Sequence, residues 1–258
     1  MNPIQKDAQM EGKIAFITGA GSGLGRAFAH AFAASGATVA ATDVAFDRVA
    51  GVVSEITGLG GKAIALRLDV SSKQEIALAV AETAARFGQI DIVVNNAGVP
   101  AFARFDDEKY DEVWNRAIAI NLTAYQVVVR AALPHLRTSK SPRIVNIASV
   151  EGLGASPDHS GYCATKAGVI GLTRAMAVEL GREGITVNCV CPGPIDTDMT
   201  GFVSAEDKVI FAKRRTVLRR YGRPEEVAHM VLSLAHPNAS YVTGSIIAVD
   251  GGLTARNS

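Results

Sequence analysis

The sequence has little net charge, few aromatic residues and few cysteines, and each shortage argues against a class of protein. Its 26 Lys and Arg residues nearly balance its 25 Asp and Glu residues, which leaves a formal net charge of +1. A chain so nearly neutral lacks the broad electrostatic attraction that nucleic acids and anionic membranes require. Disorder is not expected either, because 48% of the residues are hydrophobic and the charges are balanced, although only 6% of the chain is aromatic. The composition is typical of a globular α/β protein.

Only three cysteines are present, and their spacing is not that of a metal site. Cys163 stands far from Cys189 and Cys191, and the chain has neither a CxxC pair nor a His/Cys cluster. Cys189 and Cys191 lie two residues apart in an apparent strand, so both would face the same side as small apolar groups. We therefore expect no metal, and reduced thiols in a cytoplasmic protein.

The sequence also lacks a long hydrophobic segment. Residues 1–12 contain Lys6, Asp7 and Glu11 and no apolar run like that of a signal peptide. Elsewhere the apolar stretches are of strand length or interrupted by charge, whereas a membrane span needs about 20 apolar residues. We expect no membrane partner.

Short β-rich runs alternate with longer helical segments throughout the chain, which is the pattern of βαβ units. The predicted strands are 13–18, 38–42, 63–68, 90–94, 143–148, 186–190 and 245–249, and predicted helices include 24–35, 73–87, 107–136 and 161–182. This pattern predicts a doubly wound, Rossmann-like parallel sheet of about seven strands with helices on both faces. We expect one domain over 13–258 after an N-terminal extension, 1–12. The polar, basic stretch at about 194–221 has no clear strand and is interpreted as a substrate-binding excursion.

A glycine-rich turn, TGAGSGLG at 18–25, joins the first predicted strand to an alanine-rich helix. Backbone amides at a helix N-terminus bind pyrophosphate well where small residues let it approach. The strict G-x-G-x-x-G fingerprint is not met, since Arg26 stands in place of its third glycine. A tight turn favours glycine for structural reasons alone, but its place between strand and helix indicates a phosphate site.

Asp43 ends the second predicted strand, 18 residues after Gly25. This is close to the spacing of about 20 residues at which an acidic residue contacts the adenosine ribose. Its carboxylate would accept hydrogen bonds from the ribose hydroxyls and repel a 2′-phosphate. Alternatively, Asp43 caps the following helix, as aspartate commonly does. Because no Lys or Arg follows Asp43 directly or precedes Gly23 in the turn, the sequence favours NAD over NADP.

Tyr162 and Lys166 stand four residues apart and would share one face of the predicted helix 161–182. Such a pair also occurs by chance on partly exposed helices. For acid/base work, a tyrosine that titrates at about 10 in water must ionise nearer neutrality. A shift of about 3 units needs about 4 kcal/mol, which a unit charge ~4 Å away at an effective dielectric of ~20 supplies. Lys166, with the positive charge of a nicotinamide nearby, is expected to make Tyr162 a proton donor and acceptor.

At this point the chain resembles the short-chain dehydrogenase/reductase family along nearly its whole length. The resemblance is carried by motifs in a fixed order: Thr18-Gly19-x3-Gly23-x-Gly25, Asp69-Val70, Asn95-Asn96-Ala97-Gly98, Asn121, Ser149, Tyr162-x3-Lys166 and Pro192-Gly193-x-Ile195-x-Thr197. Each motif alone is a weak signal, but the order and spacing of all of them are highly specific.

The resemblance implies a role for each catalytic residue. Ser149 would donate a hydrogen bond to the substrate oxygen, and Tyr162 would pass the proton. Lys166 would tune the phenol and bind the nicotinamide ribose, while Asn121 would hold a water that relays protons. Without the resemblance, Ser149 would be interpreted as an ordinary strand-end hydroxyl.

The resemblance also implies an NAD cofactor site. Asp69 and Val70 would contact the adenine, and Ile195 and Thr197 the carboxamide. Taken alone, Asp69 would be interpreted as a loop or cap residue. The complete set of predicted cofactor-binding residues is Gly19, Ser22, Gly23, Leu24, Gly25, Asp43, Asp69, Val70, Asn95, Ala97, Gly98, Tyr162, Lys166, Pro192, Gly193, Ile195 and Thr197.

The favoured hypothesis is an NAD-dependent oxidoreductase that interconverts a secondary alcohol and a ketone by hydride transfer, with Tyr162 as acid/base. The alternatives are an NADPH-dependent 3-oxoacyl-thioester reductase, against which Asp43 argues, and a non-catalytic binding member of the fold. Family members usually pack the equivalents of helices 107–136 and 161–182 against a second subunit, so a homotetramer is expected. Two charged groups could contact a small-molecule substrate, although solvated loop charges are the commoner case: Glu151, Asp158 and His159, and Lys213, Arg214 and Arg215.

Overall fold

The computed structural model describes residues 10–256. Its centre is a seven-stranded parallel sheet in the order β3-β2-β1-β4-β5-β6-β7. The strands are β1 (Ile14–Thr18), β2 (Thr38–Asp43), β3 (Lys62–Arg67), β4 (Ile92–Asn95), β5 (Arg143–Ile147), β6 (Thr186–Pro192) and β7 (Ile246–Val249). The predicted doubly wound α/β fold is confirmed. Residues 1–9 of the predicted N-terminal extension lie outside the described residues.

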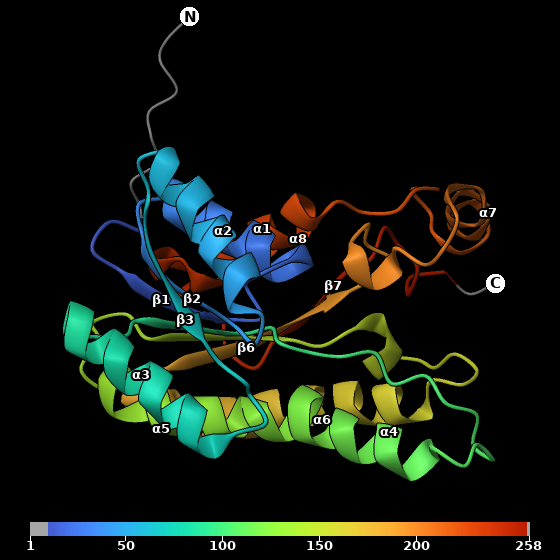
Figure 1. The fold of residues 1–258 in the computed structure, drawn as a ribbon, viewed down its shortest axis with the longest axis horizontal. Coiled ribbons are helices and arrows are strands. Elements are labelled where there is room, and N and C mark those ends of the chain that lie inside the picture. Colours follow the sequence, from blue (N-terminus) through green and yellow to red (C-terminus); the bar gives the residue numbers. More distant parts are fainter. Residues whose placement is uncertain (1–9, 257–258) are drawn as a thin grey trace, which may run out of the picture.

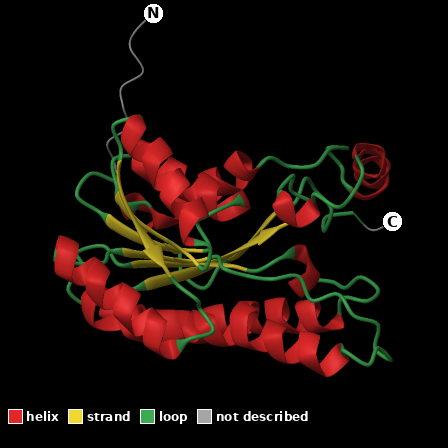
Figure 2. Ribbon diagram, viewed as in Figure 1, coloured by secondary structure: helices red, strands yellow, loops and turns green. Residues whose placement is uncertain are grey.

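Helices cover both faces of the sheet (Figures 1 and 2). One face carries α1 (Gly23–Ala34), α2 (Phe46–Gly58) and α8 (Pro224–Ala235), and the other carries α3 (Lys73–Phe87), α4 (Tyr110–Ala117), α5 (Ala124–Leu136) and α6 (Ser160–Leu180). Short 3-10 turns lie at Val150–Gly152, Gly181–Glu183, Asp198–Thr200 and Pro237–Ala239. Right-handed crossovers between parallel strands produce this three-layer arrangement.

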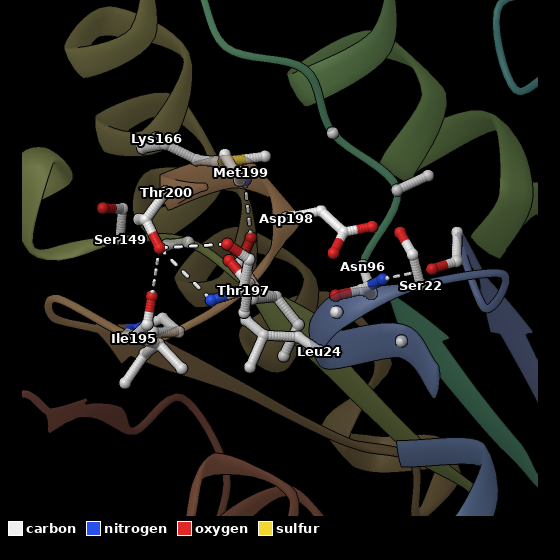
Figure 3. A pocket seen from close by; sticks show the side chains of 18 of the residues that line it. Ser22, Leu24, Asn96, Ser149, Lys166, Ile195, Thr197, Asp198, Met199 and Thr200 are labelled. Carbon is white, nitrogen blue, oxygen red and sulfur yellow. Dashed lines mark hydrogen bonds between the residues drawn. The ribbon is translucent and has the colours of Figure 1, made fainter. Parts of the chain in front are cut away.

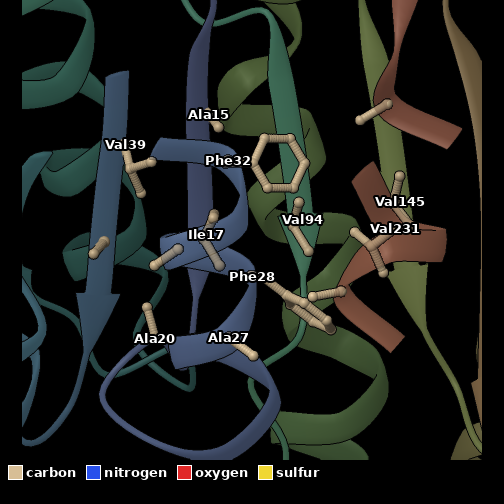
Figure 4. Packing of buried hydrophobic residues seen from close by; sticks show 14 of the residues in the cluster. Ala15, Ile17, Ala20, Ala27, Phe28, Phe32, Val39, Val94, Val145 and Val231 are labelled. Carbon is tan, nitrogen blue, oxygen red and sulfur yellow. The ribbon is translucent and has the colours of Figure 1, made fainter. Parts of the chain in front are cut away.

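The two layers of core follow from the alternation of side chains along each buried strand. In β1, Ala15 and Ile17 face the α1 side, whereas Phe16 faces the α3 and α5 side, and all three are fully buried. Phe28 and Phe32 of α1 lie over the first of these layers, beside β1 and β4 (Figure 4). Because both faces are covered, the central strands β1, β4, β5 and β6 are buried along their whole length and largely apolar.

The predicted helix 73–87 coincides with α3, because both of its ends carry clear signals. The Ser72 side chain accepts a hydrogen bond from the backbone N–H of Glu75, and Gly88 ends the helix in the left-handed region at φ 79°. The helix α2 was not among the helices predicted. Its N-cap residue, Ala45, offers no side-chain hydrogen bond, and Gly51 lies in its interior, so the local signals there are weak.

The predicted long helix 107–136 is one continuous helical segment whose middle, Ile118–Thr123, is a π-helix between α4 and α5. By length and composition alone, Tyr110–Leu136 could cross a membrane, which corrects the expectation that no segment reaches that length. Its packing supports another role, since the α5 residues Val128, Val129 and Leu136 belong to the core beneath the sheet. An amphipathic core helix passes the same test of hydropathy.

The predicted excursion leaves β6 and returns to the same edge of the fold. A parallel bridge joins Ile195 to Gly222, and the backbone N–H of Asp196 donates to the carbonyl of Gly222 at 2.9 Å. Between these points lies α7 (Ala205–Arg215), which begins at Ser204, whose side chain accepts from the backbone N–H of Asp207. The polar sequence of this segment did not predict a helix here. It stands apart from the sheet, near the C-terminal end of the chain (Figure 1).

Candidate active site

A cleft runs along the carboxyl ends of the central strands, where ligands bind in doubly wound sheets. It consists of two adjoining cavities of about 310 and 500 Å³, which share Gly19, Asp43, Ala97 and Gly98 in their walls. The first extends to the end of β5 and to α6, and the second extends over the ends of β2 and β3. The cleft is therefore long enough to bind one ligand whose two ends differ chemically, with one end in each cavity.

The glycine turn and the N-terminus of α1 form the floor of the first cavity. Ser22 is the N-cap residue, but its side chain makes no capping hydrogen bond, and no acidic residue lies in the first turn. The free N–H groups and the helix dipole suit an anionic pyrophosphate. Gly25 allows the turn to close, because a Cβ there would lie 1.9 Å from the carbonyl oxygen of Gly19.

Asp43 lies at the end of β2 with its carboxylate facing the turn. One oxygen accepts from the backbone N–H of Gly21 and the other from that of Ala45, both at 2.9 Å. The N-cap residue of α2 is Ala45 rather than Asp43, so the capping alternative does not hold as stated. The carboxylate fixes the turn and also places negative charge in the wall of both cavities.

Further polar groups join the strand ends to each other. The side-chain amide of Asn96 donates to the carbonyls of Thr18 and Gly19 at 2.9 and 3.0 Å, which fixes the end of β4 against the turn. Asp69 lies in the wall of the second cavity. Hydrogen bonds from the Ser71 hydroxyl and backbone N–H lower the pKa of Asp69, so this carboxylate stays charged.

The reactive side chains meet at the inner end of the first cavity, whose wall contains Ser149, Tyr162 and Lys166. Figure 3 shows Ser149 and Lys166 there. Ser149 lies two residues after the end of β5, and its hydroxyl oxygen accepts from the backbone N–H of Glu151 at 3.1 Å. Tyr162 and Lys166 lie one turn apart on α6, with the Lys166 ammonium 5.6 Å from the Tyr162 ring centroid. A hydroxyl, a phenol and an ammonium thus converge on one small volume.

Burial sets the proton affinities of this group. It raises the pKa of Tyr162 to about 12, although a hydrogen bond with Ser149 acts in the opposite direction. Burial also lowers the pKa of Lys166 to about 8. In the chain alone, the loss of hydration thus outweighs the hydrogen bond that favours the phenolate. The expected acidification, which included the positive charge of a nicotinamide, stays a prediction. Any acidification has to come from a further positive charge in the cleft.

The comparisons with known proteins agree with this geometry. A family model described as "Enoyl-(Acyl carrier protein) reductase" matches residues 19–254. The chain belongs to the short-chain dehydrogenase/reductase family. It is 40% identical over 245 residues to a 3-oxoacyl-[acyl-carrier-protein] reductase of Thermotoga maritima, covering 95% of this chain and 99% of the relative. It is 38% identical over 247 residues to a meso-2,3-butanediol dehydrogenase of Serratia marcescens, covering 96% of each.

A solved short-chain dehydrogenase/reductase structure has the same fold. A dehydrogenase/reductase from Sinorhizobium meliloti superposes with a TM-score of 0.90 at 38% identity, covering 98% of both chains. The family implies an NAD(P) cofactor. The uncapped α1 terminus and the glycine floor fit the pyrophosphate of such a dinucleotide, and Lys166 and Tyr162 stand where its reactive end would lie.

The structure gathers most of the predicted site residues of this dehydrogenase/reductase into the cleft. The residues that line it are Gly19, Ser22, Gly23, Leu24, Gly25, Asp43, Asp69, Val70, Ala97, Gly98, Ser149, Tyr162, Lys166, Pro192, Gly193, Ile195 and Thr197. Asn95 and Asn121 are not among its lining residues.

Asn95 lies behind the cleft rather than in its wall, which corrects the prediction. It is 1% exposed, and its side-chain amide donates to Asn146 at 2.9 Å and to the carbonyl of Tyr125 at 3.3 Å. Because side chains alternate along a strand, the neighbouring Asn96 contacts the turn instead. The Asn-Asn pair in the motif does not say which of its members faces the ligand.

Asn121 lies in the π-helix and joins this helix to the loop after β4. Its side chain accepts from the backbone N–H of Val99 at 2.8 Å and donates to the carbonyl of Val99 at 2.9 Å. A π-turn leaves main-chain groups less regularly paired than an α-helix does, and such turns are common at functional sites. Both polar atoms of the side chain make a hydrogen bond in this contact, so its role in positioning the loop is visible, while the proton-relay role stays a prediction.

Sequence reasoning missed several residues of the cleft wall. Those that lie at or directly after a strand end or a recognised motif carry a signal that could have found them: Val44, Leu68, Ser71, Asn96, Ile147 and Ala148. Val99 follows the Asn95–Gly98 motif, and Asp198, Met199 and Thr200 lie in the excursion that was already expected to bind substrate. The hydroxyl of Thr200 donates to the carbonyls of Ile195 and Thr197 at 2.9 and 3.0 Å, which ties down the start of the excursion (Figure 3). Three others lie on the long helix, where no local signal marks them: Arg116, Ala119 and Ile120.

An apolar hollow of about 520 Å³ adjoins the first cavity and shares Met199 with it. Phe102 and Phe202 also line it, although they are 45% and 75% exposed. The His159 ring meets Phe102 edge-on, with centroids 4.5 Å apart, and its buried Nδ1 has no hydrogen-bond partner. Of the residues suggested to contact substrate, His159 is thus adjacent to the hollow.

The other charged candidates are placed differently. Glu151 accepts hydrogen bonds from the Ser156 hydroxyl at 2.7 Å and the Cys163 thiol at 3.2 Å, so its carboxylate is already satisfied. Lys213, Arg214 and Arg215 form the last turn of α7 and are not among the residues that line the cavities described above.

All three cysteines are free thiols, and Cys189 and Cys191 are fully buried on one side of β6.

Proposed function

We propose that this dehydrogenase/reductase is NAD-dependent and interconverts a secondary alcohol and a ketone. The observation that carries the choice of NAD is the Asp43 carboxylate in the wall of both cavities. Its charge favours ribose hydroxyls, which donate hydrogen bonds, over a 2′-phosphate, which it repels.

The chain's own residues would handle the proton, while the bound nicotinamide would accept the hydride from the carbinol carbon. Ser149 accepts from a backbone N–H and therefore keeps its own proton to donate toward the substrate oxygen. As the phenolate, Tyr162 would take the hydroxyl proton in alcohol oxidation, and as the phenol it would return this proton in ketone reduction. The positive charge of Lys166 would favour the phenolate during this transfer.

The apolar hollow supports an uncharged substrate with a cyclic or otherwise bulky apolar group. Phe102, Met199 and Phe202 present hydrophobic surface beside the reactive side chains. Aromatic side chains give large apolar contact areas and prefer edge or offset contacts with a second ring. The residues that line this hollow include one carboxylate, Asp198, and no cationic side chain, so an anionic substrate would find no matching group there.

A second candidate is the NADPH-dependent reduction of a 3-oxoacyl thioester, which the similarity to the Thermotoga maritima reductase supports. Asp43 argues against it, because it would repel the 2′-phosphate of NADPH. A non-catalytic binding role is less well supported, since Ser149, Tyr162 and Lys166 are together in the cleft.

We further propose a homotetramer in the cytoplasm. The free thiols support a reducing compartment. The exposed side of α6, where Val178 is 84% exposed, and the half-buried apolar residues of α5 support an interface on this side of the fold.

The test is a panel of cyclic and acyclic secondary alcohols assayed with NAD+ and NADP+, beside acetoacetyl-CoA assayed with NADH and NADPH. We expect the greatest kcat/KM for an apolar cyclic alcohol with NAD+. The Tyr162→Phe variant should lose nearly all turnover, by about 10²-fold or more, while still binding NADH. Preferred turnover of acetoacetyl-CoA with NADPH would overturn the proposal in favour of the second candidate.

A further inference from the structure

A second phenol, which no motif of the sequence singled out, lies beneath the reactive group. Tyr125 is near the start of α5, directly after the π-helix, and is 1% exposed. Its hydroxyl donates to the carbonyl of Ile147, the last residue of β5, at 2.9 Å. The Lys166 ammonium donates to the same carbonyl at 2.9 Å and to the Tyr125 hydroxyl at 3.4 Å. Phenol, ammonium and carbonyl thus form a closed triangle.

The direction of these hydrogen bonds follows from the number of protons available. A phenol has one O–H to donate, and Tyr125 gives it to the Ile147 carbonyl. The oxygen can then only accept from Lys166. The ammonium also lies 5.5 Å from the centroid of the Tyr125 ring, close to its distance of 5.6 Å from the Tyr162 ring. The cation is therefore held between two aromatic rings.

The need for such a partner comes from burial. Lys166 is 3% exposed, and a buried charge is stable only where hydrogen bonds replace lost water. The titratable groups that face it are Tyr125 from α5, Tyr162 from its own helix, and the thiols of Cys189 and Cys191 from β6. Tyr125 is the one among these whose hydroxyl accepts a hydrogen bond from the ammonium.

We propose that Tyr125 is a positioning residue whose hydroxyl holds the Lys166 side chain beside Tyr162 and keeps it protonated. This inference rests on the proposed function, because it explains how that site preserves its ammonium. A purely structural Tyr125 would fill the core and satisfy the Ile147 carbonyl without any effect on the ionisation of Lys166.

The test is Tyr125→Phe, which keeps the ring and leaves Lys166 to satisfy the Ile147 carbonyl. Loss of an acceptor favours the neutral amine, so the pKa of Lys166 falls. We expect kcat for alcohol oxidation to fall several-fold at pH 8, with the KM of the alcohol little changed. The loss of kcat should become larger as the pH rises from 7 to 9. The alkaline limb of the pH profile of kcat should move to lower pH by about half a unit to one unit, equivalent to a 3- to 10-fold change in the ionisation equilibrium of Lys166.

The control is Tyr110→Phe, which removes a hydroxyl bonded to Ser160 at the start of the same helix α6, at 2.8 Å. It should leave the pH profile unchanged. A Tyr125→Phe profile that overlays the wild-type profile, with only a lower Tm, would overturn the inference.

A second readout separates this inference from the proposed function. NADH affinity is measured by cofactor fluorescence over the same pH range, which requires no turnover. If no alcohol is oxidised by the wild type, the proposed function fails. A downward shift in the pH dependence of NADH binding in Tyr125→Phe still supports the inference, and an unshifted one overturns it.

Discussion

At the scale of single residues, one side chain often serves both the fold and the chemistry. Asp43 fixes the glycine turn through the backbone N–H of Gly21 and also charges the wall of the cleft. In Lys166 the two roles conflict, because burying its ammonium lowers the stability of the folded chain. Substitutions at these residues therefore have to separate the structural effect from the chemical one.

Asp43→Asn separates the two effects at the ribose end of the cleft. The amide oxygen of asparagine can still accept from Gly21, while its NH2 group cannot accept from Ala45 and the charge that repels a 2′-phosphate is gone. We expect the ratio of kcat/KM for NAD+ over NADP+ to fall at least about tenfold, equivalent to about 1.4 kcal/mol, with a smaller fall in Tm than in Asp43→Ala. Asp43→Ala, which also loses the hydrogen bond, should lower both the ratio and the Tm. An unchanged ratio in both variants would leave Asp43 with only its structural role.

The variant Lys166→Met tests how much the buried ammonium lowers the free energy of unfolding, because this effect depends on pH. The folded pKa of about 8 lies below the ordinary value of 10.5, so the folded chain releases this proton first as pH rises. Wild-type stability should consequently increase between these two pH values relative to the variant. We expect the variant to be more stable at pH 7 by about 1–3 kcal/mol, and to lose much of this advantage by about pH 10.

Urea denaturation at both pH values measures this difference. The matched control is Lys62→Met, at an exposed position on β3. It should show no such change with pH. A variant that is less stable than the wild type at pH 7 would contradict the assignment of a net cost to the Lys166 charge.

At the scale of secondary structure, end signals placed the bounds of some elements but did not decide which elements were found. The helix α3 has a serine cap at one end and a left-handed glycine at the other, and its predicted bounds are those observed. The helix α8 was not predicted, although Pro224 begins it and Glu226 accepts from the backbone N–H of Arg223. The helices α2 and α7 were not predicted either. The first has a weak N-terminal signal, and the second lies in a polar segment whose helical pattern does not bury an apolar stripe against the sheet.

Substituting alanine for two glycines tests the local preferences of a helix interior and a helix end, and the two changes in stability should have opposite signs. Gly51 lies exposed in the interior of α2 with open space around its Cα, so Gly51→Ala should stabilise the chain by about 0.5–1 kcal/mol. Gly88 ends α3 at φ +79°, so Gly88→Ala should destabilise it by about 1–2 kcal/mol. Urea denaturation measures both. Equal signs for the two variants would contradict this account.

At the scale of the whole molecule, the sheet order brings distant segments to one edge. The turn after β1, the loop after β4, the serine after β5 and the start of the excursion after β6 all meet in the cleft. Apolar residues that stay exposed on the outer helices bear on how chains of this protein assemble. Val178 on α6 and Leu59 after α2 are both exposed, but only Val178 lies on the proposed interface.

The proposed tetramer predicts a particle of four times the chain mass of 27.0 kDa in sedimentation equilibrium. Val178→Lys should place a charge in a desolvated contact and shift the protein to smaller species. Leu59→Lys, at a similarly exposed position on the other face, should sediment like the wild type. A wild-type monomer, or equal behaviour of the two variants, would contradict the proposed interface.

The sequence by itself determined the parallel α/β fold, because alternating apolar strands and amphipathic helices can bury their surfaces only in a layered sheet. It also identified most of the cleft wall, since the carboxyl ends of parallel strands meet at one edge and the motifs lie at those ends. It misplaced Asn95, because a pair of adjacent asparagines does not say which one points outward.

Only the tertiary structure decided the electrostatics of the reactive group. The spacing of Tyr162 and Lys166 indicated an acidic phenol, whereas burial raises the pKa of that phenol and lowers that of the ammonium. Tyr125, 41 residues before Lys166, enters the site through packing between α5 and α6. Hydration and long-range contacts depend on what surrounds a side chain in three dimensions, and residue spacing along one helix carries no record of it.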